Sequence, residues 1–203
     1  PPDDWKAYGD IGVLLGRAIA ASPAFQAAGR FRGAETIRAT VVGAGSHATD
    51  LSGSTIFYRD MTFPLKNLPI LKLTAQEERG DAAALAQSIR DKLGWFADEG
   101  GLSQLVLALR GEDNPTYSRI QALARGVADG LAPLRAAGFV PIVAVECDQA
   151  KVLGQALAPL VDGPLLCLDG VGVDSGDYLD IGAPVAGGTV LPVVIKTLAF
   201  QKS

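Results

Sequence analysis

The chain has 203 residues, of which 48% are hydrophobic and 20% charged, and its formal net charge is −4. This balance lacks the basic footprint of nucleic-acid-binding proteins, so we expect no nucleic acid partner. No apolar run reaches the roughly 18 residues that a membrane-spanning helix needs, and no signal-peptide pattern opens the chain, so we expect no membrane partner. Cys147 and Cys167 each lie beside an apolar run, which favours two buried reduced thiols and a cytoplasmic protein.

The first third of the chain predicts one helix and several extended segments. Apolar spacing from residue 11 onward predicts a helix that ends near Ser22. Residues 37–42 predict a strand that leads into a glycine turn, and residues 54–58 predict a second strand. Residues 63–73 contain two prolines, so we expect an extended segment at a sheet edge or in a connection.

Composition changes near Thr74, where a polar stretch at 76–80 predicts a boundary between domains at 1–75 and 76–203. After it, apolar residues recur at helical spacing from Leu85 to Phe96, which predicts a helix.

The second domain predicts an α/β fold with a parallel sheet. Apolar runs predict buried strands at 105–109, 139–145 and 164–168. Asn114, followed by a proline, is the expected cap of the first connecting helix, and Asp148 is the expected cap of the second. This β-α-β-α-β order implies a parallel sheet with helices on its faces. The tail, residues 171–195, is rich in glycine and β-branched residues and predicts short strands and hairpins.

Several kinds of chemistry can be weighed on this framework. Gly43-Ala44-Gly45-Ser46-His47-Ala48 matches the G-x-G-x-x-A pattern of a dinucleotide site. That site also needs a helix that starts within the glycines, and the following residues, with Gly53 among them, disfavour a long helix. Ser46 and His47 are adjacent, so their side chains are expected to diverge, which disfavours a hydrolase triad. No phosphate-binding P-loop pattern occurs.

Two groups of polar residues have an ordinary and a functional interpretation. Four aspartates cluster between residues 169 and 180. We favour their interpretation as turn residues whose carboxylates accept backbone N–H groups, and a divalent-ion site is the alternative. Polar residues also follow each parallel strand, where ligands of open α/β sheets bind, but ordinary solvated loops are the favoured explanation. They are Arg110, Glu112, Asp113, Glu146, Asp148, Lys151 and Asp169. From these patterns we assign no catalytic residue and no metal site.

Long segments across nearly the whole chain resemble one known family. They are residues 40–47, 51–56, 64–69, 169–171, 176–182 and 187–198. The family is that of the ethanolamine utilization protein EutA, the reactivating factor of ethanolamine ammonia-lyase. It is related to the Hsp70, actin and sugar-kinase ATPases and is chaperone-like.

The resemblance implies a function for the family's full-length proteins. They use ATP and Mg²⁺ to release damaged cobalamin from the inactivated lyase, so that intact adenosylcobalamin replaces it. The implied partner is therefore ethanolamine ammonia-lyase with bound cobalamin, in the cytoplasm. Formation of a homo-oligomer and association with a bacterial microcompartment stay open.

The resemblance also implies a nucleotide site at the glycine turn. Gly43, Ala44, Gly45 and Ser46 match the position at which the superfamily contacts adenosine, where a glycine permits close approach. The phosphate-binding hairpin and the acidic residue that positions Mg²⁺ are not found before residue 40. We therefore expect residues 1–75 to be part of an actin-like ATPase domain within a C-terminal fragment that has little ATPase activity alone. The alternatives are a Rossmann-type nucleotide-binding enzyme and a purely structural module that docks the lyase.

Overall fold

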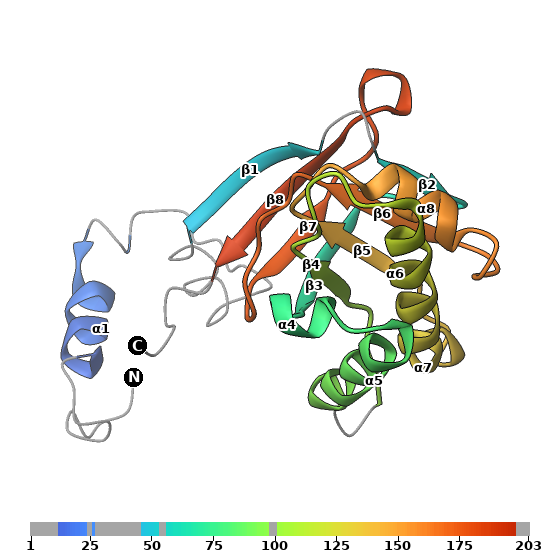
Figure 1. Ribbon diagram of the computed structural model, residues 1–203. Helices are drawn as coiled ribbons and strands as arrows, with labels where there is room; N and C mark the ends of the chain where they lie inside the picture. The colour runs from blue at the N-terminus through green and yellow to red at the C-terminus, as the bar shows by residue number, and fades with distance from the viewer. Residues whose placement is uncertain (1–11, 24–25, 27–45, 53–55, 98–100, 198–203) are drawn as a thin grey trace. The chain divides into compact units, whose positions relative to one another are not determined.

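The computed structural model describes residues 12–23, 26, 46–52, 56–97 and 101–197 (Figure 1). Contacts divide the chain into two compact units, Pro1–Ala39 and Thr40–Ser203. In the first unit, helix α1 spans Gly12–Ala21, which confirms the predicted helix. The strand predicted at 37–42 lies outside the described residues.

In the second unit, the described residues form one mixed sheet with helices packed against it. The strands are β1 (Ser46–Ser52), β2 (Phe57–Arg59), β3 (Leu65–Lys72), β4 (Val106–Leu109), β5 (Ile142–Val145), β6 (Leu165–Asp169), β7 (Tyr178–Ile181) and β8 (Leu191–Thr197). The helices are α4 (Ala75–Glu78), α5 (Ala82–Leu93), α6 (Tyr117–Gly130), α7 (Ala132–Ala136) and α8 (Ala150–Leu157), with the short 3₁₀ turns η1 (Gly94–Phe96) and η2 (Ala186–Gly188). The strand order is β1-β8-β7-β3-β4-β5-β6-β2.

The parallel β-α-β-α-β unit is confirmed. Strands β3, β4, β5 and β6 are parallel, with α6 and α7 between β4 and β5, and α8 between β5 and β6. Every residue of β4, β5 and β6 is buried. Strands covered on both faces read as unbroken apolar runs, and this is the signal by which the sequence predicts them.

The two faces of these strands are covered in different ways. Alternate residues such as Leu107 join a core with α5, α6 and α8. Their neighbours, such as Val106 and Ala108, instead join a core with Leu179 and Val193 of the antiparallel strands β7 and β8. The sequence predicts helices on the faces of the sheet. Among the described residues, the helices cover one face and the curled end of the sheet covers the other, because β7 and β8 are themselves apolar on their inner side.

Strand β3 corrects the interpretation of residues 63–73 as an edge or connecting segment. It lies inside the sheet, between β7 and β4. Its first half pairs antiparallel with β7 up to Pro69, and its second half pairs parallel with β4 from Ile70 onward. Pro69 has no N–H to donate, and it sits where the strand changes partner. The sheet therefore tolerates a proline in an internal strand.

The caps of two connecting helices also differ from the prediction. Thr116, and not Asn114, is the N-cap of α6, and its side chain accepts a hydrogen bond from the Arg119 N–H at 3.2 Å. Asn114 instead adopts a left-handed turn conformation with φ 54°. Gln149, and not Asp148, is the N-cap of α8, and its side chain makes no capping hydrogen bond.

The remaining expectations for the second unit are largely confirmed. The tail forms the antiparallel pair β7 and β8, and the strand predicted at 54–58 is seen as β2, within the described residues. The polar stretch at 76–80 is mostly helix α4, which has a capping box between Thr74 and Glu77. The division at 75/76 stays a prediction. Within the described residues, no helix combines the length and apolarity needed to cross a membrane.

Candidate functional site

The glycine turn contributes only one described residue to a candidate site. Gly43, Ala44 and Gly45 lie outside the described residues, and Ser46 is the first residue of β1, where it pairs with Thr197. Residues 46–52 therefore continue as a strand. A dinucleotide site requires a helix there to direct its N-terminus at the pyrophosphate. The expected failure of that helix is confirmed, and it disfavours the Rossmann alternative.

The aspartates of the tail serve the turns and strands around them. The Asp177 carboxylate accepts the Asp174 N–H at 2.8 Å, and Asp180 accepts the Asn67 N–H at 2.7 Å. Asp180 also pairs with Lys196 at 2.6 Å. The favoured interpretation as turn residues is thus confirmed for Asp177. No group of three acidic, histidine or cysteine residues in the described part of the chain is arranged to hold a metal ion.

The carboxyl ends of the parallel strands do gather polar side chains, but their centre is a residue that the sequence patterns missed. Glu78, at the end of α4, is buried, with 6% of its surface exposed. Its two carboxylate oxygens accept the N–H groups of Arg110 at 2.8 Å and Gly111 at 3.0 Å. Burial raises the pKa of Glu78 and outweighs the two backbone hydrogen bonds, which act in the opposite direction. The Thr74-x-x-Glu77 spacing of a capping box was the available signal that this stretch is helical.

Arg119 joins this carboxylate region to the start of α6. Its Nε donates to Glu112 at 2.7 Å, and its terminal nitrogens donate to the backbone oxygens of Gly80 and Glu78. The loop after β4 is therefore tied both to α4 and to α6. The guanidinium is occupied by these partners.

Lys72 organises a second cluster at the same edge. Its ammonium lies 3.1 Å from Glu146, after β5, and 3.0 Å from Asp174. Burial acts to lower the pKa of Lys72, but the hydrogen bonds and charges of Asp174 and Glu146 outweigh it and leave the pKa raised. Of the residues predicted at the strand ends, Glu146 thus pairs with Lys72 and Glu112 pairs with Arg119. Arg110 contributes its backbone N–H to Glu78, and its side chain is exposed.

Gln149 lies buried beside the first cluster, with 3% of its surface exposed. Neither its Oε1 nor its Nε2 has a hydrogen-bond partner within the described part of the chain. Gly111, in a left-handed conformation with φ 78°, packs directly against it. A Cβ at Gly111 would come within 2.3 Å of Gln149 Nε2, so glycine is required for this close approach. With Glu78, Glu112 and Arg119, these two residues line a small cavity, which we call the nook.

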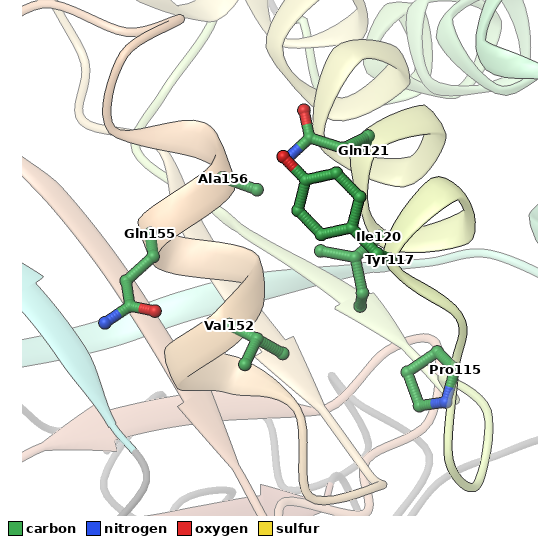
Figure 2. Close-up of a pocket in the computed structure, with 7 residues that line it drawn as sticks. All are labelled: Pro115, Tyr117, Ile120, Gln121, Val152, Gln155 and Ala156. Carbon is green, nitrogen blue, oxygen red and sulfur yellow. The ribbon is translucent and has the colours of Figure 1, made fainter.

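A larger groove adjoins the nook between α6 and α8 (Figure 2). Its volume is about 460 Å³. Its walls are Pro115, Tyr117, Ile120, Gln121, Val152, Gln155 and Ala156. Pro115 and Ile120 line both the groove and the nook. The described residues thus form a mainly apolar groove beside a small cavity that holds the amide of Gln149 and the side chains of Glu78, Glu112 and Arg119.

The comparisons with known proteins agree on one family. The family model described as ethanolamine utilisation protein EutA matches residues 2–201. The chain is 37% identical over 201 residues to the ethanolamine ammonia-lyase reactivase EutA of Salmonella typhimurium, and 35% identical over 200 residues to the protein of the same name from Escherichia coli. Each alignment covers 98% of this chain and 41% of the relative, so the chain spans about two fifths of their length.

No solved structure matches the chain significantly, so the family assignment comes from sequence. The family match extends over nearly all of the chain, and it confirms the resemblance drawn from the individual segments. The chain belongs to the ethanolamine utilisation protein EutA family.

Proposed function

We propose that this chain works, as part of a longer reactivase, in the ATP-dependent release of damaged cobalamin from ethanolamine ammonia-lyase. The observation that carries the proposal is the 37% identity, over 98% of the chain, to a protein named as the reactivase of that lyase. Identity at this level over a whole segment indicates a shared role. The lyase with its bound cobalamin is the proposed partner.

In this proposal, the turn at Gly43–Ser46 contacts the adenosine of ATP, and groups outside this chain bind the phosphates and Mg²⁺. After the turn the chain continues as strand β1, Ser46–Ser52. Residues 1–75 would belong to the actin-like domain and 76–203 to the α/β domain. Since β3 of the first part pairs with β4 of the second, we expect movement in the ATPase part to reach the α/β part through the sheet.

The test uses the full-length protein that contains this chain. Ethanolamine ammonia-lyase is inactivated with a cobalamin that lacks the adenosyl group, and ethanolamine deamination is followed after adenosylcobalamin is added. We expect activity to return only when the protein, ATP and Mg²⁺ are all present. Absence of recovery under these conditions, with a lyase that is active before inactivation, contradicts the proposed function.

A variant of the turn tests the proposed adenosine contact. In Gly45→Val the side chain is expected to block close approach of the nucleotide, so both ATP binding and recovery of the lyase should fall at least tenfold. Gly172→Val is the matched control, because a Cβ at Gly172 meets no atom within 4 Å. Equal ATP affinity in the two variants would contradict the proposed contact between the turn and the nucleotide. It would not contradict the proposed reactivase function.

A further inference from the structure

We propose that the groove between α6 and α8, together with the nook, binds a small neutral molecule that has an apolar body and a carboxamide group. The body would lie in the groove, and the carboxamide would pair with Gln149. This site is separate from the glycine turn, and the proposal does not depend on the reactivase role.

The groove has the dimensions and lining that such a ligand needs. At about 460 Å³ it lies in the size range of small-molecule sites. In Figure 2, Tyr117 and Ile120 of α6 stand across the gap from Val152 and Ala156 of α8. Tyr117 is 79% exposed and Val152 is 47% exposed, although both are large apolar groups. A planar body placed between them would cover surface that the described part of the chain leaves in water.

Gln149 supplies the polar end of the site. It directly precedes α8, the helix that carries Val152 and Ala156 of the groove wall. As the N-cap of α8 it makes no capping hydrogen bond, and its amide lines the nook. An amide buried with neither atom paired costs free energy that a partner would recover. The nook measures only about 10 Å³, so it admits one polar group while the rest of a ligand stays in the groove.

The charges around the nook select against anions. Glu78 and Glu112 place two carboxylates there, and the guanidinium of Arg119 is already bonded to Glu112 and to two backbone oxygens. A phosphate or a carboxylate would therefore meet negative charge without a free donor cation. A neutral group is favoured.

A carboxamide is the neutral group that fits Gln149 best. The glutamine amide offers one acceptor oxygen and an NH₂ donor, and both are unpaired within the described residues. A ligand amide presents the complementary donor and acceptor together, so it satisfies both atoms at once. A ketone or an ether would satisfy only the donor.

The test compares three probes of nearly equal shape on the full-length protein that contains this chain. Benzamide carries the carboxamide, acetophenone replaces its NH₂ with a methyl group, and benzoate carries a negative charge. Binding is followed by two-dimensional ¹H–¹⁵N NMR, in which Gln149→Met identifies the side-chain NH₂ signal of Gln149. We expect saturable benzamide binding that shifts this signal, with an affinity roughly three- to tenfold above that of acetophenone and no benzoate binding.

Variants locate the effect. Gln149→Met keeps the length of the side chain and removes its polar atoms, so benzamide should lose its advantage over acetophenone. Gln155→Met, on the groove wall, should keep that advantage, and Val152→Ala should weaken both probes alike. The proposal is overturned if wild-type protein binds benzamide no better than acetophenone. In that case a water molecule in the nook would be the partner of Gln149. It is equally overturned if the preference survives in a folded Gln149→Met protein.

Discussion

Arg59, on the edge strand β2, donates a hydrogen bond from Nε to the backbone oxygen of Gly163 at 2.8 Å. The same guanidinium reaches the oxygens of Ala158 and Val161, just beyond the end of α8. One side chain thus satisfies three carbonyl groups of the turn that follows the helix and precedes β6. Carbonyls at helix ends need such partners, and a cation there also suits the helix dipole.

We therefore expect Arg59→Ala to lower the free energy of unfolding by about 1–3 kcal/mol, through the loss of charge-assisted hydrogen bonds. Arg59→Lys should recover only part of this, because an ammonium cannot hold the planar fork. Urea unfolding followed by circular dichroism measures both. Arg125→Ala, at an exposed position on α6, is the control. Equal stability of Arg59→Ala and Arg125→Ala would show that the three contacts contribute nothing.

The packing of α5 on α6 depends on a glycine. A Cβ at Gly130 would lie 2.8 Å from Ile89 Cβ. Alanine forms helices better than glycine, yet here we expect Gly130→Ala to destabilise the fold by about 1–3 kcal/mol, because the two helices must separate. Gly94→Ala, where a Cβ meets nothing within 4 Å, should be neutral or stabilising. Thermal unfolding measures the stability of both variants. A Gly130→Ala protein that is more stable than wild type would contradict the packing argument.

The contacts of Glu77 predict that the fold loses stability in acid. Burial acts to raise its pKa, but the hydrogen bonds from Lys92 and Thr74 outweigh burial and leave the pKa below the ordinary value of 4.5. A lowered folded-state pKa means that this stability is present above pH 4.5 and is lost as the pH falls through the folded-state pKa. Glu77→Gln should therefore be less stable than wild type near neutral pH, and the difference should shrink in acid. Urea midpoints between about pH 3 and pH 7 test this, with Asp162→Asn at an exposed site as the control. A difference that is independent of pH would assign the effect to the cap alone.

The two cysteines should both react slowly. Burial raises the pKa of both thiols, and at Cys147 the charge and hydrogen bond of Asp113 raise it further. Because the thiolate is the reactive form, Asp113→Asn should speed alkylation of Cys147 by iodoacetamide severalfold near pH 8, while Cys167 stays unreactive until unfolding. Mass spectrometry of timed samples resolves the two sites. An unchanged rate at Cys147 would show that exposure, and not the carboxylate, controls it.

The predictability of this fold follows from where each local signal is strong. The runs at 105–109 and 164–168 predict β4 and β6 because strands buried on both faces leave an unmistakable apolar pattern. The prediction of an edge or connecting segment at residues 63–73 was wrong, because a proline such as Pro69 normally marks an edge strand. Only the tertiary structure shows that β3 changes its pairing partner beside Pro69. The predicted N-cap of α6, Asn114, has a left-handed backbone conformation in the loop before the helix, and Thr116 is the N-cap instead.

The candidate site could be predicted only in part. The strand-end rule points to the edge of the sheet where the candidate site lies, and it names Glu112 and Glu146. It misses Glu78 and Gln149. The sequence around the short polar helix α4 does not show that Glu78 is buried, and the sequence before α8 does not show that the Gln149 side chain is buried instead of capping the helix. The close approach of Gly111 to Gln149 is likewise a property of the folded chain, because these residues lie on different loops.

The divided pairing of β3 has a consequence for the order of folding. Its second half can pair with β4 early in synthesis, since those strands are near in sequence. Its first half must wait for β7, and β7 is held by β8, which ends at Thr197. Until then the apolar surface of β3 to β6 that β7 and β8 cover stays open on the nascent chain. We expect chaperone contact and aggregation to concentrate on that face, in the interval before β8 leaves the ribosome.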